Sequence, residues 1–190
     1  MKWTIPGTVL ESESEQAVSI RQQMESMCLG GGMVLSQVCA ITGLEPYAVQ
    51  NWVKRGFLTP PRNKRYTLRQ LCRIININML KGVLPLERIC GLLGYVNGQL
   101  DDESDDPIDD SHLYFLFVRL AAYHRQMNNP AGREAFMKEV LDEYEEPVPG
   151  SRERVEKVLR IMLTAWAASQ LRQATESMLE GLMNENKEKE

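Results

Sequence analysis

Apolar residues along most of this chain recur at intervals of three and four positions, the spacing that places them on one face of an α-helix. Glycine and proline interrupt this pattern and indicate where one helix ends and the next begins. The sequence therefore predicts a mainly α-helical protein. The most closely punctuated part is the unit from Leu35 to Tyr95.

This unit opens with two short predicted helices. Thr42-Gly43 ends the first, because glycine takes the left-handed conformation needed past a helix end. Glu45-Pro46 starts the second, since the missing N–H of proline costs nothing at the first helical position. Two short helices joined by a tight turn are typical of a helix-turn-helix, and its second helix is expected to lie in a DNA major groove. The predicted inward residues are Leu35, Val38, Cys39, Ile41, Val49, Trp52 and Val53.

A strongly basic loop follows the second helix. Gly56 ends that helix, and Pro60-Pro61 restricts any hairpin between Leu58 and Thr67 to a short, exposed one. Arg62-Asn63-Lys64-Arg65-Tyr66 places three cations around an asparagine turn. Such a loop suits a wing that lies along the phosphate backbone of DNA.

Two more helices complete the unit. The segment from Thr67 to Gln70 has the pattern of a capping box and opens the third helix. Pro85 opens the fourth, which Gly94 is expected to stop. The predicted inward residues are Leu71, Ile74, Ile75 and Met79 in the third helix, then Leu86, Ile89, Leu92 and Leu93 in the fourth.

Positive charge is concentrated in the same unit. From Leu35 to Tyr95 there are nine basic and two acidic residues, a local balance of +7, whereas the whole chain has a formal net charge of −4. Concentrated positive charge on a helical unit is the electrostatic footprint of a nucleic-acid-binding protein. Asn and Gln can pair with adenine, and Lys and Arg with guanine or phosphate. The expected DNA-binding residues are Ser36, Gln37, Tyr47, Gln50, Asn51, Lys54, Arg55, Arg62, Lys64, Arg65 and Tyr66. Arg69, Arg73 and Arg88 are left open between DNA contact and plain surface.

The order helix, turn, second helix, Gly-Phe-Leu-x-Pro, basic loop ending in Arg-Tyr, then two helices resembles the winged DNA-binding domain of MerR-type transcription regulators. More closely, the chain is similar to an uncharacterised bacterial family that pairs such a domain with a helical C-terminal half. The resemblance implies dimers on pseudo-palindromic promoter DNA, with the second helix in the major groove and the wing on the backbone. Gln50-Asn51-Trp52 stands where MerR-type helices usually carry Arg-Tyr-Tyr or Arg-Phe-Tyr.

The rest of the chain divides around this unit. We expect an N-terminal arm and amphipathic helix in residues 1–32, a winged helix-turn-helix domain in 33–98, an acidic linker in 99–110 and an α-helical dimerisation or sensor domain in 111–190. In the first segment, a capping box from Ser12 to Glu15 is expected to start the helix. That helix is too short to be stable alone, so it must pack on the C-terminal half or on a partner subunit.

The acidic segment holds seven acidic residues and no basic one between Gln99 and Asp110, which is typical of a solvated linker. Asp101, Glu103 and Asp105 alternate as in a calcium-binding EF-hand loop. However, Asp106 occupies the place of the required glycine and His112 that of the bidentate glutamate, so the calcium alternative is disfavoured.

The C-terminal half is predicted to be a helical bundle. Ser111 is expected to cap one helix running to about Met127, Asn129-Pro130 starts a second, and Pro149-Gly150-Ser151 leads into a third of about thirty residues. Ten apolar positions of that last helix form one stripe, which suits the centre of a bundle or a dimer seam. They are Val155, Val158, Leu159, Met162, Leu163, Trp166, Leu171, Ala174, Met178 and Leu182.

Composition limits the remaining classes of function. The 190 residues are 43 % hydrophobic, enough for a core, but no apolar run approaches the ~20 residues of a membrane span. The first ten residues lack a signal-peptide pattern, so the expected location is the cytoplasm. The four cysteines lack metal-binding spacing and are expected in the core. No catalytic constellation, cofactor motif or metal site stands out.

The sequence favours a DNA-binding transcription regulator that forms a homodimer on double-stranded DNA, with a small-molecule effector as a possible further partner. One alternative is a protein-interaction adaptor built on the winged scaffold. Another is a small-molecule sensor, for which the expected marker is an enclosed pocket among Phe136, Tyr144, Met162 and Trp166.

Overall fold

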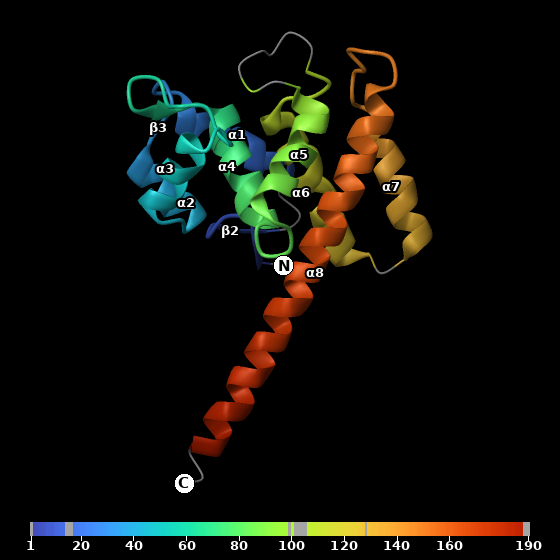
Figure 1. The fold of residues 1–190 in the computed structure, drawn as a ribbon. Helices are drawn as coiled ribbons and strands as arrows, with labels where there is room; N and C mark the ends of the chain where they lie inside the picture. Colours follow the sequence, from blue (N-terminus) through green and yellow to red (C-terminus); the bar gives the residue numbers. More distant parts are fainter. Residues whose placement is uncertain (1, 14–16, 99, 101–105, 128, 188–190) are drawn as a thin grey trace.

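The computed structural model describes residues 2–13, 17–98, 100, 106–127 and 129–187 (Figure 1). Within them the chain forms eight helices and two small antiparallel sheets, which confirms the mainly helical prediction. The helices are α1 (Ala17–Cys28), α2 (Leu35–Thr42), α3 (Pro46–Lys54), α4 (Leu68–Leu80), α5 (Leu86–Asn97), α6 (Asp110–Gln126), α7 (Pro130–Asp142) and α8 (Ser151–Lys187). The strands are β1 (Lys2–Thr4), β2 (Glu11–Glu13), β3 (Met33–Val34) and β4 (Arg65–Tyr66).

Helix α4 is the centre of the fold. It packs against α1, α2, α5, α6 and α8, and every residue from 71 to 77 is buried. The predicted inward residues are indeed buried, but so are Cys72, Arg73, Asn76 and Ile77 between them, because neighbours cover α4 on several sides. The capping box is also confirmed: Thr67 Oγ1 accepts from the Gln70 N–H at 3.2 Å, and Gln70 Oε1 accepts from the Thr67 N–H at 2.9 Å.

One hydrophobic core runs through both halves of the chain. The predicted packing of the N-terminal helix on the C-terminal half is confirmed, since α1 lies against α6 with Ile20 and Met24 buried. Met27, near the end of the same helix, is 45 % exposed. Of the cysteines, Cys72 is fully buried while the other three are half-buried.

The N-terminal arm is a β-hairpin, which corrects the predicted capping box. Ser12 lies in β2, where it pairs with Trp3 of β1, and α1 begins only at Ala17. Glu15, the other half of that box, lies outside the described residues. Trp3 and Ile5 are buried, so the apolar arm is part of the core.

Two helix boundaries also differ from the prediction. Helix α5 continues past Gly94 to Asn97 and ends at Gly98. Helix α6 is capped by Asp109 in place of Ser111, because the Asp109 carboxylate accepts the backbone N–H groups of Ser111 and His112. Glycine can continue a helix that is held by tertiary packing, and aspartate caps a helix as well as serine does.

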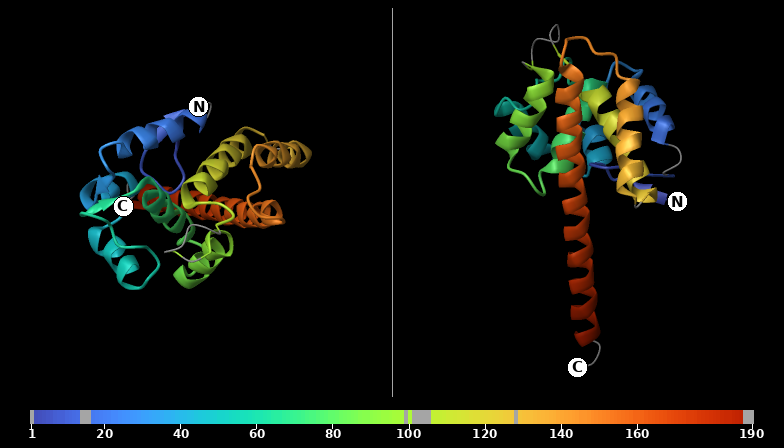
Figure 2. Two further views of the ribbon diagram at one scale, coloured as in Figure 1. Left: turned by 90° about the horizontal axis from the view of Figure 1, so that it is seen from above. Right: turned by 90° about the vertical axis from the view of Figure 1, so that its right-hand side faces the viewer.

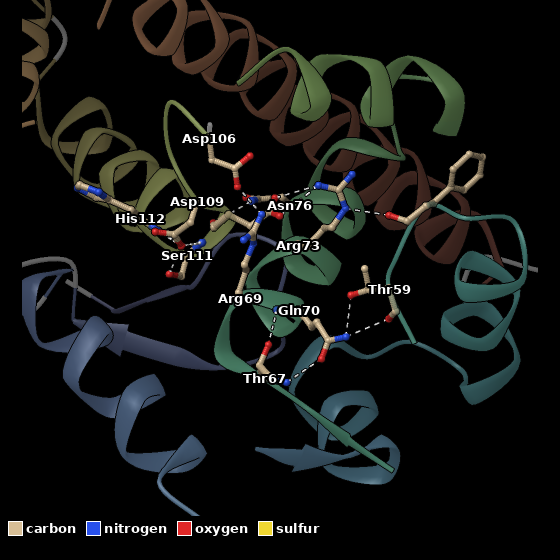
Figure 3. Close-up of polar contacts among 12 residues, drawn as sticks. Thr59, Thr67, Arg69, Gln70, Arg73, Asn76, Asp106, Asp109, Ser111 and His112 are labelled. Carbon is tan, nitrogen blue, oxygen red and sulfur yellow. Dashed lines mark hydrogen bonds and ion pairs between the residues drawn. The ribbon is translucent and has the colours of Figure 1, made fainter. Parts of the chain in front are cut away.

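A buried ion pair joins α4 to α6 (Figure 3). Arg73 Nη1 lies 3.1 Å from Asp110 Oδ2, and the two residues are only 4 % and 1 % exposed. Arg73 Nε also donates to the Phe57 carbonyl at 2.8 Å, and Asn76 donates to the Asp110 carbonyl at 3.3 Å. Burial raises the pKa of Asp110, while the charge of Arg73 opposes that rise.

The end of the acidic segment is therefore not solvated, contrary to the prediction. Besides Asp110, the carboxylate of Asp106 is largely buried and pairs with Arg69 at 2.5 Å (Figure 3). Residues 99 and 101–105, which include the disfavoured calcium-binding alternation, lie outside the described residues.

The β3–β4 sheet brings the basic hairpin of residues 62–66 back to the start of α2. Met33 pairs with Tyr66 and Val34 with Arg65. Gly32, just before β3, has φ = 98°, and a Cβ there would lie 2.4 Å from the Tyr66 carbonyl oxygen. Only glycine fits this position.

Helix α8 has two halves with different surroundings. Its first half lies beside α5, α6 and α7, and its second half projects from the body (Figures 1 and 2). From Gln170 to Asn184 every side chain is exposed. Within the described parts of the chain, no helix combines the length and the apolar character needed to cross a membrane.

Removing one member of the buried pair should destabilise the fold strongly. Asp110→Asn leaves the Arg73 guanidinium buried without its counter-charge, and we expect a loss of about 3–5 kcal/mol in the free energy of unfolding. Glu153→Gln, which breaks the exposed Lys157 pair, is the control and should cost far less, because solvent screens that pair. Equilibrium unfolding in urea measures both. Equal losses would show that the buried pair has no special structural role.

The three consecutive glycines before β3 allow a graded test of the β3–β4 contact. Gly30→Ala meets open space, Gly31→Ala adds only the strain of φ = 83°, and Gly32→Ala adds strain and a backbone clash. The expected order of destabilisation is Gly32 > Gly31 > Gly30, with Gly32→Ala losing more than about 1 kcal/mol. Thermal unfolding of the three variants measures it. Equal melting temperatures for all three would contradict the close β3–β4 approach.

Candidate nucleic-acid interface

Helices α2 and α3 are held at a fixed angle by their turn. Gly43 takes the left-handed conformation at φ = 67°, and its N–H donates to the Cys39 carbonyl at 2.8 Å, as the sequence predicts. Asn78 of α4 donates to the carbonyl of Thr42 at 2.8 Å. The turn is therefore attached to the central helix.

Helix α3 begins with Pro46 at its first position, also as predicted. Val49 and Trp52 are buried against the core. Burial of this face leaves the opposite one in solvent, where Tyr47 is 72 % exposed. Gln50, Asn51 and Lys54 are exposed with it, so α3 presents one polar and aromatic face.

The basic hairpin is a tight turn. Asn63 and Lys64 have φ values of 49° and 61°, and the Arg65 N–H donates to the Arg62 carbonyl at 2.9 Å. Two central residues with positive φ are characteristic of the type I′ turn that joins hairpin strands. The predicted asparagine turn is therefore present, with Lys64 at its exposed tip.

The loop leading to this hairpin is fixed by Gln70. Its side-chain amide donates to the Thr59 carbonyl at 3.0 Å and to the Thr59 hydroxyl at 2.9 Å (Figure 3). It also donates to the Pro60 carbonyl at 3.1 Å. The same side chain takes part in the capping box. The first turn of α4 therefore positions the hairpin.

A hollow of about 680 Å³ lies between the start of α2, helix α3 and the basic hairpin, and we call it the α3 hollow. Five of the eleven predicted DNA-binding residues line it, from three separate segments. They are Ser36, Gln50, Lys54, Lys64 and Tyr66. Leu35, Val53 and Pro61 add apolar surface.

Ten of the eleven predicted residues are exposed, and Tyr66 is the exception. Its side chain is 3 % exposed, and burial raises the pKa of its hydroxyl. Because Met33 pairs with Tyr66 across the sheet, this ring is turned into the core. We therefore correct Tyr66 from a surface position to a core position.

The other six predicted residues lie outside the α3 hollow, and three of them are engaged within the protein. Gln37 accepts from the Val34 N–H at 3.0 Å and so caps α2. Arg55 pairs with Glu87 of α5 and lies 4.5 Å from the centre of the Phe57 ring. Arg65 donates to the Gly32 carbonyl at 2.8 Å. Tyr47, Asn51 and Arg62 are exposed.

The basic charge of the unit is partly neutralised. Arg55, Arg69 and Arg73 pair with Glu87, Asp106 and Asp110. Among the described residues, the other six cations have no carboxylate partner. They are Lys54, Arg62, Lys64, Arg65, Lys81 and Arg88. Arg69 and Arg73, left open from the sequence, are structural.

Sequence reasoning missed the acidic partners and the anchoring role of Gln70. The sequence does contain a signal for the buried pair. Arg73 and Asn76 stand among the apolar residues of α4, so burial is expected there, and a buried arginine needs an acidic partner. No signal in the sequence pairs Glu87 with Arg55, because that contact depends on how α5 packs.

The pocket expected of a small-molecule sensor is not formed by the four predicted residues. Phe136 stacks on Tyr123 with ring centres 4.1 Å apart. Tyr144 lines a cavity of about 920 Å³ beside α6, whereas Trp166 lines a different pocket near the N-terminal hairpin. Met162 is fully buried in the core.

Comparisons with known proteins find a similar family and a similar protein, and the description of neither names an activity. Residues 33–117 match a family described as a domain of unknown function, DUF1836. The chain is 28 % identical over 115 residues to the "Uncharacterized protein YkrK" of Bacillus subtilis (strain 168), an alignment that covers 57 % of this chain and 48 % of that protein. It thus spans about half the length of that relative. No solved structure matches the chain.

Proposed function

We propose that this protein is a sequence-specific DNA-binding transcription regulator with no catalytic activity, and that segment 33–98 acts as a MerR-like winged helix-turn-helix. The observation that carries the proposal is the convergence of exposed polar and cationic side chains from α2, α3 and the basic hairpin around the α3 hollow. This arrangement suits a helix in a major groove with a basic wing on the adjacent backbone.

The proposal assigns two kinds of role. Gln50 and Asn51, exposed on α3, read base edges, because amides can pair bidentately with adenine. Lys54, Arg62 and Lys64 contact phosphates, as unpaired cations beside or on the hairpin. Arg55 contacts phosphate only if its Glu87 pair opens, so it is a weaker candidate.

We also propose that the regulator is a homodimer joined by the projecting half of α8. Leu171, Thr175, Met178 and Leu182 follow one another at intervals of four, three and four, the heptad spacing of a coiled-coil seam. The three apolar members are 71 %, 76 % and 58 % exposed. A second copy covers the same stripe with its own and supplies the second DNA reader that a palindromic site requires.

A specific observation supports a second candidate function, that of a small-molecule sensor. The cavity of about 920 Å³ lies between α1, the start of α4 and α6, and is lined by Arg69, Asp106, His112, Arg119 and Tyr144. Its size suits a small ligand. A ligand there would contact the Arg69–Asp106 pair. Arg69 lies in the first turn of α4, directly after the basic hairpin, so one protein could both sense a ligand and bind DNA.

The DNA proposal is tested by a variant that improves backbone geometry while it removes a charge. Glycine suits φ = 61° better than lysine does, so Lys64→Gly should keep the free energy of unfolding within about 1 kcal/mol. With the three unpaired cations Lys54, Arg62 and Lys64 on phosphates, random duplex DNA should bind with a log–log salt slope of about −2.7 per protomer. Lys64→Gly should flatten that slope by about 0.9.

Fluorescence anisotropy over a range of salt concentrations measures these slopes. Lys157→Gln, which removes a cation from α8 away from the interface, is the matched control and should leave the slope unchanged. The absence of DNA binding at low salt, or the same effect from both variants, would overturn the proposal.

The dimer proposal is tested by placing charge in the seam. Met178→Glu should convert a dimer into a monomer, because two carboxylates would meet between the helices. Ser177→Glu adds the same charge to a neighbouring position outside the seam and should leave the dimer intact. Sedimentation equilibrium at micromolar concentration measures the mass. A monomeric wild-type protein, or a Met178→Glu variant that still dimerises, would contradict the α8 seam.

A further inference from the structure

A second pocket, distinct from the α3 hollow, lies where α8 leaves the body, and we call it the α8 pocket. Its volume is about 420 Å³. Four segments form its walls: the turn of the N-terminal hairpin, the end of α4, the last turn of α6 and the middle of α8. In Figure 1 this is the region where the N-terminal strands lie beside the point at which α8 emerges. No step of the proposed DNA recognition uses it.

The charged residues that line the α8 pocket are all cations. They are Lys81 after α4, Arg125 of α6 and Arg172 of α8. Among the described residues, no carboxylate lines the pocket. In a chain whose net charge is −4, three cations from three elements around one pocket are not explained by average composition.

These cations are poorly neutralised by the protein itself. Lys81 and Arg125 have no ion-pair partner among the described residues, and Arg125 instead lies over the Trp3 ring at 5.7 Å. Arg172 has only an exposed contact with Glu176 at 3.5 Å on its own helix. Burial lowers the pKa of Lys81, which is expected for an ammonium group that lacks a nearby anion.

The walls of the pocket are held in place. Asn78 donates to the Gly7 carbonyl at 2.9 Å, and Tyr114 donates to the Pro6 carbonyl at 2.9 Å, so the hairpin turn is fixed to α4 and α6. A Cβ on Gly7 would lie 2.6 Å from the Ile75 carbonyl oxygen, which shows how closely the turn approaches α4. The pocket is therefore largely preorganised for a ligand.

The approach of Arg172 to the pocket depends on a second glycine. A Cβ on Gly82 would lie 3.2 Å from Arg172 Nη2 and 3.7 Å from the Ser169 hydroxyl. Because Gly82 has no side chain, the Arg172 guanidinium and the buried Ser169 hydroxyl of α8 lie directly against the end of α4. The guanidinium, the hydroxyl and the Lys81 ammonium are all hydrogen-bond donors to an oxyanion.

We propose that the α8 pocket binds a small phosphate-bearing anion through Lys81, Arg125 and Arg172. A phosphate carries close to two negative charges and several acceptor oxygens, so it can satisfy two guanidinium groups and an ammonium group together. A single carboxylate would leave most of the positive charge uncompensated. The volume exceeds that of phosphate alone, and Trp166 in the wall provides an apolar surface for an organic part of the ligand.

Binding has a structural consequence. The three cations repel one another while the pocket is empty of anion, and they belong to elements that must pack together where α8 emerges. An anion between them turns repulsion into attraction and strengthens the attachment of α8 to α4 and α6. Ligand binding should therefore raise the thermal stability of the protein.

Inorganic pyrophosphate is the probe, titrated into the full chain without DNA while sodium chloride keeps the ionic strength constant. The melting temperature should rise with pyrophosphate, and tryptophan fluorescence should change because Trp166 lines the pocket. Arg172→Gln and Lys81→Gln should each weaken binding about tenfold, the effect of losing one charge-assisted hydrogen bond. Lys157→Gln, on the same helix outside the pocket, should bind as the wild type does.

Two results would overturn the site: no response to millimolar pyrophosphate at constant ionic strength, or an equal response in all four proteins. Arg172 is exposed on its outer side, so Arg172→Gln keeps the test valid should Lys81→Gln fail to fold. Since these measurements need no DNA, their outcome is independent of whether the protein proves to bind DNA.

A DNA-binding experiment identifies the source of the phosphate. If a free phosphate compound is the ligand, Arg172→Gln weakens pyrophosphate binding about tenfold and leaves DNA affinity unchanged. If a DNA backbone phosphate occupies the pocket, pyrophosphate competes with duplex DNA and Arg172→Gln weakens binding to every sequence. Both results support the site, and they distinguish its two possible occupants.

Discussion

The ion pair between Arg73 and Asp110 is the constraint on which the rest of the structure depends. Arg73 lies inside the central helix and Asp110 at the start of α6, and both are almost fully buried. Any arrangement of the two helices that parts this pair while the core stays closed would leave each charge buried without its counter-charge, which is strongly unfavourable. The two halves of the chain therefore form one body with a continuous core.

This pair explains which parts of the fold the sequence could predict. Helical periodicity and the punctuation at Gly43 and Pro46 depend on neighbours a few residues away, so those elements were found. The partners of Arg73 and Arg69 are 37 residues further along the chain, and periodicity carries no information at that distance. For the same reason the sequence predicts a solvated linker where Asp106 and Asp110 are in fact buried.

In the candidate interface, too, features that depend on nearby residues were predictable, and features that depend on distant contacts were not. Exposure of Gln50, Asn51 and Lys54 follows from the polar face of α3, which is the same whichever neighbour covers the opposite face. Tyr66 was misplaced because its orientation depends on pairing with β3, a strand of only two residues. The free charge of Arg55 was overestimated, since Glu87 approaches it only through the packing of α5.

The central helix also determines how a signal could travel through this protein. The first turn of α4 fixes the basic hairpin through Gln70, its middle holds α6 through Arg73, and its end borders the α8 pocket. Coupling between sites requires an element with two arrangements, and a helix buried on all sides by one core has little room for a second. The projecting half of α8 has no such restraint within the described chain (Figure 2). A ligand at the base of α8 would therefore act by fixing the direction of that helix, and in the proposed dimer this direction would set the distance between the two copies of α3.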